Sequence, residues 1–159
     1  MRSSARCLQM FWLTMPTFET MRRTTVILLC LLATGAIRAQ GTLNVEVVLN
    51  KPKGAGQLMM LLCPSKEAYD DEVGCTPKEV SAADRTVRVT FTDVAPGTYA
   101  VKVFHDINSN GKLDTSWIGW PQEPYGFSND APVNTGPPSF KLAAITVKEG
   151  AQTVRINLR

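Results

Sequence analysis

The segment HDINSNGKLD, residues 105–114, holds most of the side chains in this sequence that could perform chemistry. Two aspartates, two asparagines and a glycine fall in the pattern D-x-N-x-N-G-x-x-D. Oxygen ligands at every second position of a tight turn converge on one point, and Ca²⁺ takes six to eight oxygens. The candidate ligands are the side chains of Asp106, Asn108, Asn110 and Asp114 and the carbonyl of Lys112.

The same loop also fits a purely structural turn. In an EF-hand a bidentate glutamate closes the loop at position 12, where this chain has Trp117, and no flanking helix is predicted. A calcium site would therefore need water or another carboxylate, with Glu123 and Asp130 as candidates. Against it, Asx side chains bond to their own backbone, and Asn-Gly is a strong hairpin signal. The residues leave both interpretations open.

His105, the only histidine of the chain, precedes Asp106. A single histidine excludes a multi-histidine zinc site, and any histidine-dependent hydrolase must use this residue. Its parity in the preceding alternating segment makes it the last inward residue of a core strand. A structural histidine is therefore favoured over an acid–base pair with Asp106. We expect a protein that is not an enzyme.

The segment from residue 106 to residue 139 is too long for an ordinary connection and carries an unusual number of aromatic and proline residues. Its rings could form a binding surface for an extracellular glycan or an envelope protein. Alternatively they could pack onto the domain and close its core, which the interleaved glycines and prolines favour. The candidate surface residues are His105, Trp117, Trp120, Glu123, Tyr125 and Phe127.

The elements that position these residues show a period of two. Six strands are predicted, with room for a seventh inside the long loop, and residues 65–69 form one helical turn capped by Ser65. The predicted strands span residues 42–49, 57–63, 86–91, 98–105, 141–148 and 153–158. Short spacing and turns rich in Gly and Pro indicate an all-β fold, an antiparallel seven-stranded sandwich with one long Gly/Pro/aromatic loop.

The first 39 residues read as a removable leader. Residues 21–39 have the basic, apolar and small-residue order of a signal peptide, and residues 1–20 read as an upstream extension. The apolar run at 26–33 is shorter than the roughly 20 residues that span a bilayer. We therefore expect a periplasmic or secreted domain at residues 40–159, without a membrane span after cleavage.

The expected mature domain is nearly neutral. Cleavage would remove five of the 17 lysines and arginines and one of the 14 acidic residues, leaving a net charge of −1. No basic patch suggests a nucleic-acid partner. Cys63 and Cys75 are the two cysteines that remain, and an even pair in an exported domain predicts a disulfide.

Three segments resemble the bacterial family DUF2141: TFTDVAPGTYAVKVFHDINSNGKLD, GWPQEPYGFSND and PPSFKLAAITV. Lys141-Leu142 stands where that family commonly has an acidic residue, and the position of Glu123 depends on the alignment around it. The resemblance implies an exported immunoglobulin-like or transthyretin-like sandwich, with no established activity. Because a few transthyretin-like folds are enzymes, a small hydrolase using His105 and Asp106 is the alternative.

Overall fold

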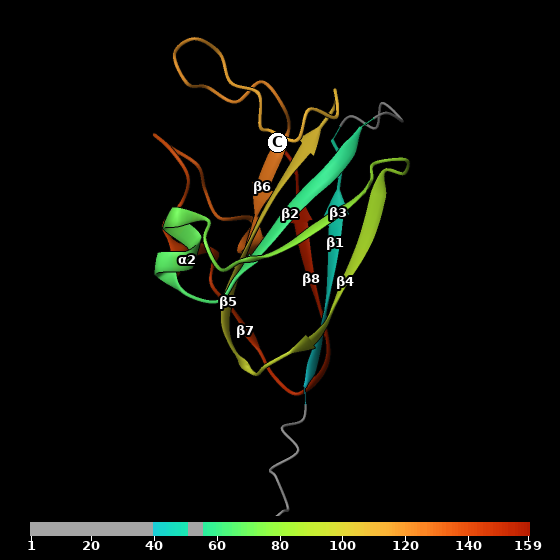
Figure 1. The fold of residues 1–159 in the computed structure, drawn as a ribbon. Coiled ribbons are helices and arrows are strands. Elements are labelled where there is room, and N and C mark those ends of the chain that lie inside the picture. Colours follow the sequence, from blue (N-terminus) through green and yellow to red (C-terminus); the bar gives the residue numbers. More distant parts are fainter. Residues whose placement is uncertain (1–39, 51–55) are drawn as a thin grey trace, which may run out of the picture. The chain divides into compact units, whose positions relative to one another are not determined.

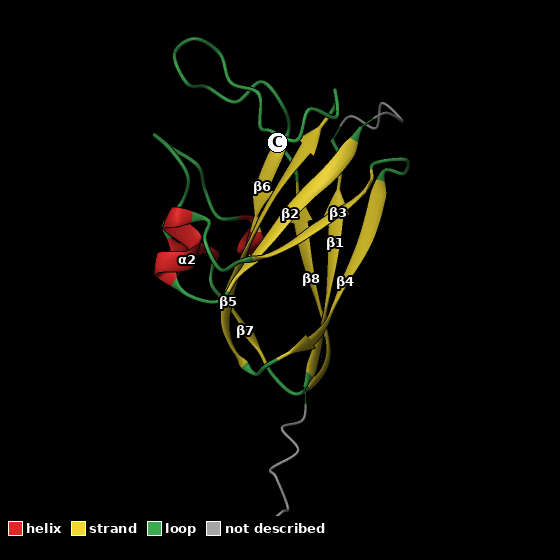
Figure 2. Ribbon diagram, viewed as in Figure 1, coloured by secondary structure: helices red, strands yellow, loops and turns green. Residues whose placement is uncertain are grey.

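The computed structural model describes residues 40–50 and 56–159, which form eight strands in two packed sheets (Figures 1 and 2). The expected leader at residues 1–39 and part of the turn after the first strand lie outside the described residues. The strands are β1 (Gly41–Val48), β2 (Gln57–Cys63), β3 (Thr76–Ser81), β4 (Thr86–Val94), β5 (Gly97–Asp106), β6 (Tyr125–Phe127), β7 (Ile145–Val147) and β8 (Gly150–Asn157). The helical turns are α2 (Lys66–Asp71), η1 (Ser128–Asp130) and α3 (Phe140–Ala143). The predicted sandwich is confirmed, with eight strands instead of seven.

One sheet has the strand order β4-β1-β8. Residues of β1 alternate between buried and half-buried positions, as their period of two predicts. The prediction of a wholly antiparallel sandwich is wrong for one pair, because β1 and β8 run parallel. These two strands come from opposite ends of the domain and need no hairpin, so nothing local forces them to run in opposite directions.

The other sheet has the order β3-β2-β5-β6, and β7 pairs with the first residues of β5. The continuous apolar run of β2 lies in the centre of this sheet, between β3 and β5. Leu58, Met60 and Leu62 face the core, whereas Met59 and Leu61 face outward and are half-buried. The run is therefore apolar on both faces of a central strand.

Between the sheets lies the main core, built from the inward rows of β1, β2, β4, β5 and β8. A second, smaller core lies on the outer face of the β3-β2-β5-β6 sheet. Cys63, Ala100 and Phe127 of that sheet pack there against residues of α2 and α3, such as Tyr69 and Ala143. This second core covers one end of the outer face.

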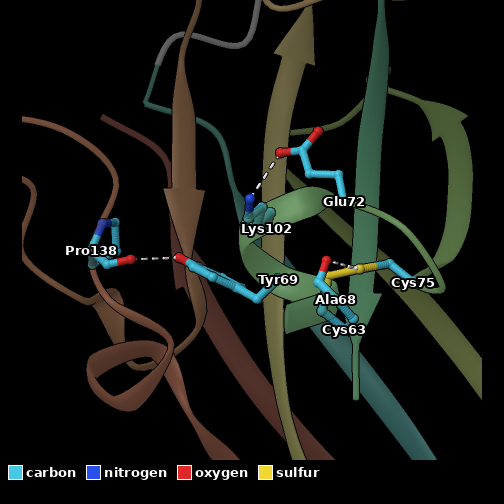
Figure 3. A network of polar contacts seen from close by, with 7 residues as sticks. All are labelled: Cys63, Ala68, Tyr69, Glu72, Cys75, Lys102 and Pro138. Carbon is cyan, nitrogen blue, oxygen red and sulfur yellow. Dashed lines mark hydrogen bonds and ion pairs between the residues drawn. A yellow bond between two sulfur atoms is a disulfide. The ribbon is translucent and has the colours of Figure 1, made fainter. Parts of the chain in front are cut away.

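The helical turn α2 begins as predicted, because the Ser65 side chain accepts a hydrogen bond from the Ala68 amide at 3.2 Å. The predicted disulfide between Cys63 and Cys75 links β2 to the start of β3 beyond this helix (Figure 3). Cys75 Sγ also lies 3.1 Å from the Ala68 carbonyl oxygen. The cross-link therefore fixes α2 against the outer face of the sheet.

Two other sequence predictions need correction. The strand expected over residues 141–148 is a helical turn, α3, followed by the three-residue strand β7. β3 was not foreseen, because its sequence TPKEVS is almost wholly exposed and has no apolar alternation. In the part of the chain that the structure describes, no helix has the length and apolar character needed to cross a bilayer.

Candidate functional site

The D-x-N-x-N-G loop begins at the last residue of β5 and projects from one end of the sandwich (Figure 1). Asp106 is fully buried there, although it is an acidic residue. Gly56, the residue before β2, lies directly against it with φ +89°, and a Cβ at this position would come within 2.2 Å of the Asp106 carbonyl oxygen. The end of β5 therefore requires a glycine beside it.

The carboxylate of Asp106 organises the turn. Its Oδ1 accepts a hydrogen bond from the Asn110 amide at 3.0 Å, and its Oδ2 accepts one from the Gly111 amide at 2.6 Å. Gly111 has φ +78°, which a glycine adopts without strain. Because both oxygens of this buried carboxylate bind backbone donors, the loop has its own internal anchor.

The polar side chains at the outer end of the loop converge on Asp114. Asn108 Nδ2 donates to Asp114 Oδ2 at 2.7 Å, and Asn110 Nδ2 donates to Asp114 Oδ1 at 2.9 Å. The oxygens of the same two amides accept backbone hydrogen bonds, Asn108 Oδ1 from Asn110 and Asn110 Oδ1 from Lys112. The residues that the spacing predicted to meet do meet, through hydrogen bonds among themselves.

Glu123 closes the base of the loop. Its Oε1 accepts from the Ile107 amide at 2.7 Å and its Oε2 from the Asp114 amide at 3.0 Å. The side chain is only 6% exposed. One carboxylate therefore joins the first and last turns of the loop, a role that sequence reasoning missed because it depends on the return path of the chain.

The donor set suits a hydrogen-bonded turn better than a calcium site. For both asparagines to present oxygens beside Asp114, their amides must rotate by half a turn, which breaks four hydrogen bonds within the loop. Asp130 is not brought to the loop, because its carboxylate accepts from the backbone and side chain of Asn157 in β8. Among the described residues, no three His, Cys, Asp or Glu side chains are grouped to hold a metal ion.

His105 is the last inward residue of β5, as its parity predicted, and is 1% exposed. It pairs with Leu58 across β2, and its amide donates to the Pro124 carbonyl at 2.8 Å. Neither His105 nor Asp106 is accessible to a substrate in solvent. Glu123 is likewise closed to solvent, and Phe127, at 8% exposed, nearly so, which removes these residues from the candidate surface.

The two tryptophans of the loop are exposed instead of packed. Trp117 is 96% exposed and Trp120 is 56% exposed, with Ile118 between them at 56%. The favoured packing of all the loop rings onto the domain is therefore wrong for these two, whereas Tyr125 is half-buried beside Phe127. Among the described residues, no strand or helix covers these two rings.

This tryptophan turn, residues 116–120, is nevertheless held in one shape. The Ser116 amide donates to the Trp120 carbonyl at 2.7 Å, and the Gly119 amide donates to the Ser116 carbonyl at 2.8 Å. Ser116 Oγ accepts from the Trp120 amide at 3.1 Å. Below the turn, Thr115 and Pro121 form an isolated bridge. An exposed pair of indoles on a hydrogen-bonded turn is suited to contact another molecule.

A further polar network on the outer face was not predicted from the sequence (Figure 3). Lys102 Nζ lies 2.8 Å from Glu72 Oε1 and 4.3 Å from the centre of the Tyr69 ring. The Tyr69 hydroxyl donates to the Pro138 carbonyl at 3.0 Å. Burial raises the pKa of Tyr69 to about 12. The pattern of β5 gives Lys102 as an outward residue, but its partners are Tyr69 of α2 and Glu72, the residue after α2, which only the folded chain brings near.

Fold and site together define an eight-stranded β-sandwich domain with two features at one end: the D-x-N-x-N-G loop, residues 106–114, which we call the Asx loop, and the exposed tryptophan turn. The chain belongs to DUF2141, a family described as an uncharacterized protein conserved in bacteria, which it matches over residues 45–155. The matched region contains the Asx loop and the tryptophan turn. No curated protein and no solved structure matches the chain significantly.

Proposed function

We propose that this chain is an exported, non-enzymatic binding module that contacts another component of the cell envelope through its tryptophan turn. The observation that carries the proposal is the exposure of Trp117 and Trp120 on a turn with a fixed backbone. A rigid turn loses little conformational freedom when it binds, and a Trp side chain gives a large contact area. Envelope glycans and envelope proteins are the two partner classes to test.

Two observations support the other parts of the proposal. His105 and Asp106, the residues on which a hydrolase would depend, are 1% and 0% exposed. The Cys63–Cys75 disulfide fits an oxidising compartment outside the cytoplasm, in agreement with the signal-like order of residues 21–39. Mass spectrometry of the protein recovered from cells tests export, because cleavage after Ala39 places Gln40 at the N-terminus.

Intrinsic fluorescence tests the binding surface directly. Trp12 belongs to the expected leader, so Trp117 and Trp120 are the only tryptophans of the expected mature chain. A binding partner should shift their emission to the blue and reduce quenching by iodide. Solubilised cell-wall glycan and detergent-extracted envelope proteins are titrated separately, and Trp117→Ser should remove most of the response.

A photo-crosslinking residue at position 118 identifies a protein partner. The adduct should disappear when Trp117 is replaced by serine. Val73, which is 74% exposed beyond α2, supplies the matched control position for the cross-linker. If position 73 gives the same adducts as position 118, and if no glycan alters the fluorescence, the tryptophan turn is not the binding surface.

Calcium binding by the Asx loop is the second candidate function. The observation behind it is that Asn108 and Asn110 surround the Asp114 carboxylate, so that Ca²⁺ would have to exchange the four hydrogen bonds of their amides for oxygen ligands around one point. Two carboxylates and two amides indicate weak binding, with a Kd of roughly 10⁻⁴ to 10⁻³ M. A calorimetric titration tests it: wild type but not Asp114→Asn should release or absorb heat at millimolar Ca²⁺, and no heat from wild type rules the site out.

A further inference from the structure

The outer face of the β3-β2-β5-β6 sheet is apolar over much of its area. The outward side of a sandwich sheet is normally polar, because it meets water. Here the strand register places two rows of outward side chains across the sheet. One row is Glu79, Met59, Phe104 and Tyr125, and the other is Pro77, Leu61, Lys102 and Phe127.

Only part of this face is covered by the rest of the chain. The second core, formed with α2 and α3, buries Cys63, Ala100 and Phe127. Met59, Leu61 and Phe104 remain half-buried. A groove of about 580 Å³ lies over them, and Leu113 of the Asx loop and Pro137 contribute to its walls. Its volume falls within the range of roughly 300 to 1,000 Å³ that is typical of small-molecule sites.

Some of the charged side chains that line the groove have an ion-pair partner and others do not. Lys102 is neutralised by Glu72, and its ammonium also lies over the Tyr69 ring (Figure 3). Lys112, on the Asx loop, also lines the groove, and its side chain makes no ion pair with any described residue. Glu79 and its neighbour Lys78 both line the groove from β3, at the opposite edge of the sheet from β6, and the Lys78 ammonium lies 5.9 Å from the centre of the Phe91 ring. Among the described lysines of the groove, Lys112 is therefore the one whose charge is best placed to bind an anionic group on a ligand.

We propose that this groove binds a small amphiphile with an apolar body and one anionic headgroup. Met59, Leu61 and Phe104 contact the apolar body, which leaves water on binding. Lys112 binds the headgroup, and its position on the loop at one end of the groove sets the orientation of the ligand. The site is separate from the tryptophan turn and independent of the function proposed for it.

Dodecanoate, kept below its micelle concentration, is the probe. Isothermal titration of the protein purified from its producing cells should give saturable binding at one site. The cationic analogue dodecyltrimethylammonium, which has the same alkyl length, should bind at least tenfold more weakly. Lys112→Glu should abolish this preference, whereas Lys148→Glu, an exposed lysine between β7 and β8, should leave it unchanged.

A second set of variants tests the apolar floor and separates the two sites. Phe104→Ala should weaken dodecanoate binding at least tenfold, and Met59→Ala serves the same purpose if the first variant fails to fold. Trp117→Ser should leave dodecanoate binding intact while removing the response to an envelope partner. The proposal is overturned if dodecanoate does not saturate, if both amphiphiles bind equally, or if the tryptophan variant also loses dodecanoate.

Discussion

Replacing Glu123 by glutamine should loosen the Asx loop and destabilise the whole domain. The carboxylate accepts two backbone hydrogen bonds, from Ile107 at 2.7 Å and from Asp114 at 3.0 Å, in a site that is 94% shielded from solvent. Hydrogen bonds to charged groups contribute about 1.5–3 kcal/mol each. The amide of glutamine keeps one acceptor and points its NH₂ group at the other backbone donor. We therefore expect the free energy of unfolding to fall by about 2–4 kcal/mol.

Urea denaturation followed by two probes measures this effect. Far-UV circular dichroism reports the sheets, and fluorescence reports the loop, because both tryptophans of the expected mature chain lie between Asp114 and Glu123. In the variant the fluorescence transition should occur at a lower urea concentration than the circular dichroism transition, since the loop has lost its closing contact. Amide hydrogen exchange at Ile107 and Asp114 should become faster in the same variant.

The matched control is Glu79→Gln, which changes an exposed carboxylate on β3. It should alter the free energy of unfolding by less than about 0.5 kcal/mol. If Glu123→Gln is equally mild, or if the exchange of the two amides is unchanged, Glu123 does not close the loop. The hydrogen bonds that we assign to it would then contribute nothing measurable.

Three further predictions concern the frame of the domain. Burial raises the pKa of Tyr69 to about 12, against 10.0 for an unperturbed tyrosine, so the stability it confers is complete below pH 10 and is lost as the pH rises towards 12. Urea unfolding measures the free energy of unfolding at pH 9 and at pH 11.5. Its fall between the two pH values should be about 1–3 kcal/mol smaller in Tyr69→Phe than in wild type, and an equal fall in both proteins would contradict the role of Tyr69. Replacing Cys63 and Cys75 by alanine should cost roughly 3 kcal/mol in the same assay, because the disulfide closes a short loop, and an unchanged midpoint would contradict the cross-link. Gly56→Ala should lower the thermal midpoint by several degrees, since its Cβ would overlap the Asp106 carbonyl, whereas Gly136→Ala, with no neighbour within 4 Å, should not.

The elements with local signals could be predicted from the sequence. The alternation in β1, β4 and β5 gave the inward residues, and the Ser65 cap gave the start of α2. The pairing of Cys63 with Cys75 was predicted from the number of cysteines outside the expected leader. Each of these depends on residue types within a few positions or on simple counting.

The features that depend on contacts distant in sequence could not be predicted. β3 is a strand because its backbone pairs with β2, although its own side chains are exposed and include Pro77. Glu123 reaches Ile107 only because the chain folds back after the tryptophan turn. The exposure of Trp117 was also missed, because composition cannot show whether any element lies beside a ring.

Three of the buried polar side chains among the described residues, Asp106, Glu123 and Ser128, serve the backbone. Asp106 and Glu123 bind the amides of the Asx loop, and Ser128 accepts from Val101 and donates to Ala143. A group whose hydrogen-bonding capacity is used in this way holds a shape but is not available to a ligand. Stability and the proposed binding should therefore be separable. Substitutions at Asp106 or Glu123 should lower the free energy of unfolding, whereas substitutions at the exposed Trp117 should leave it unchanged and weaken only the proposed binding.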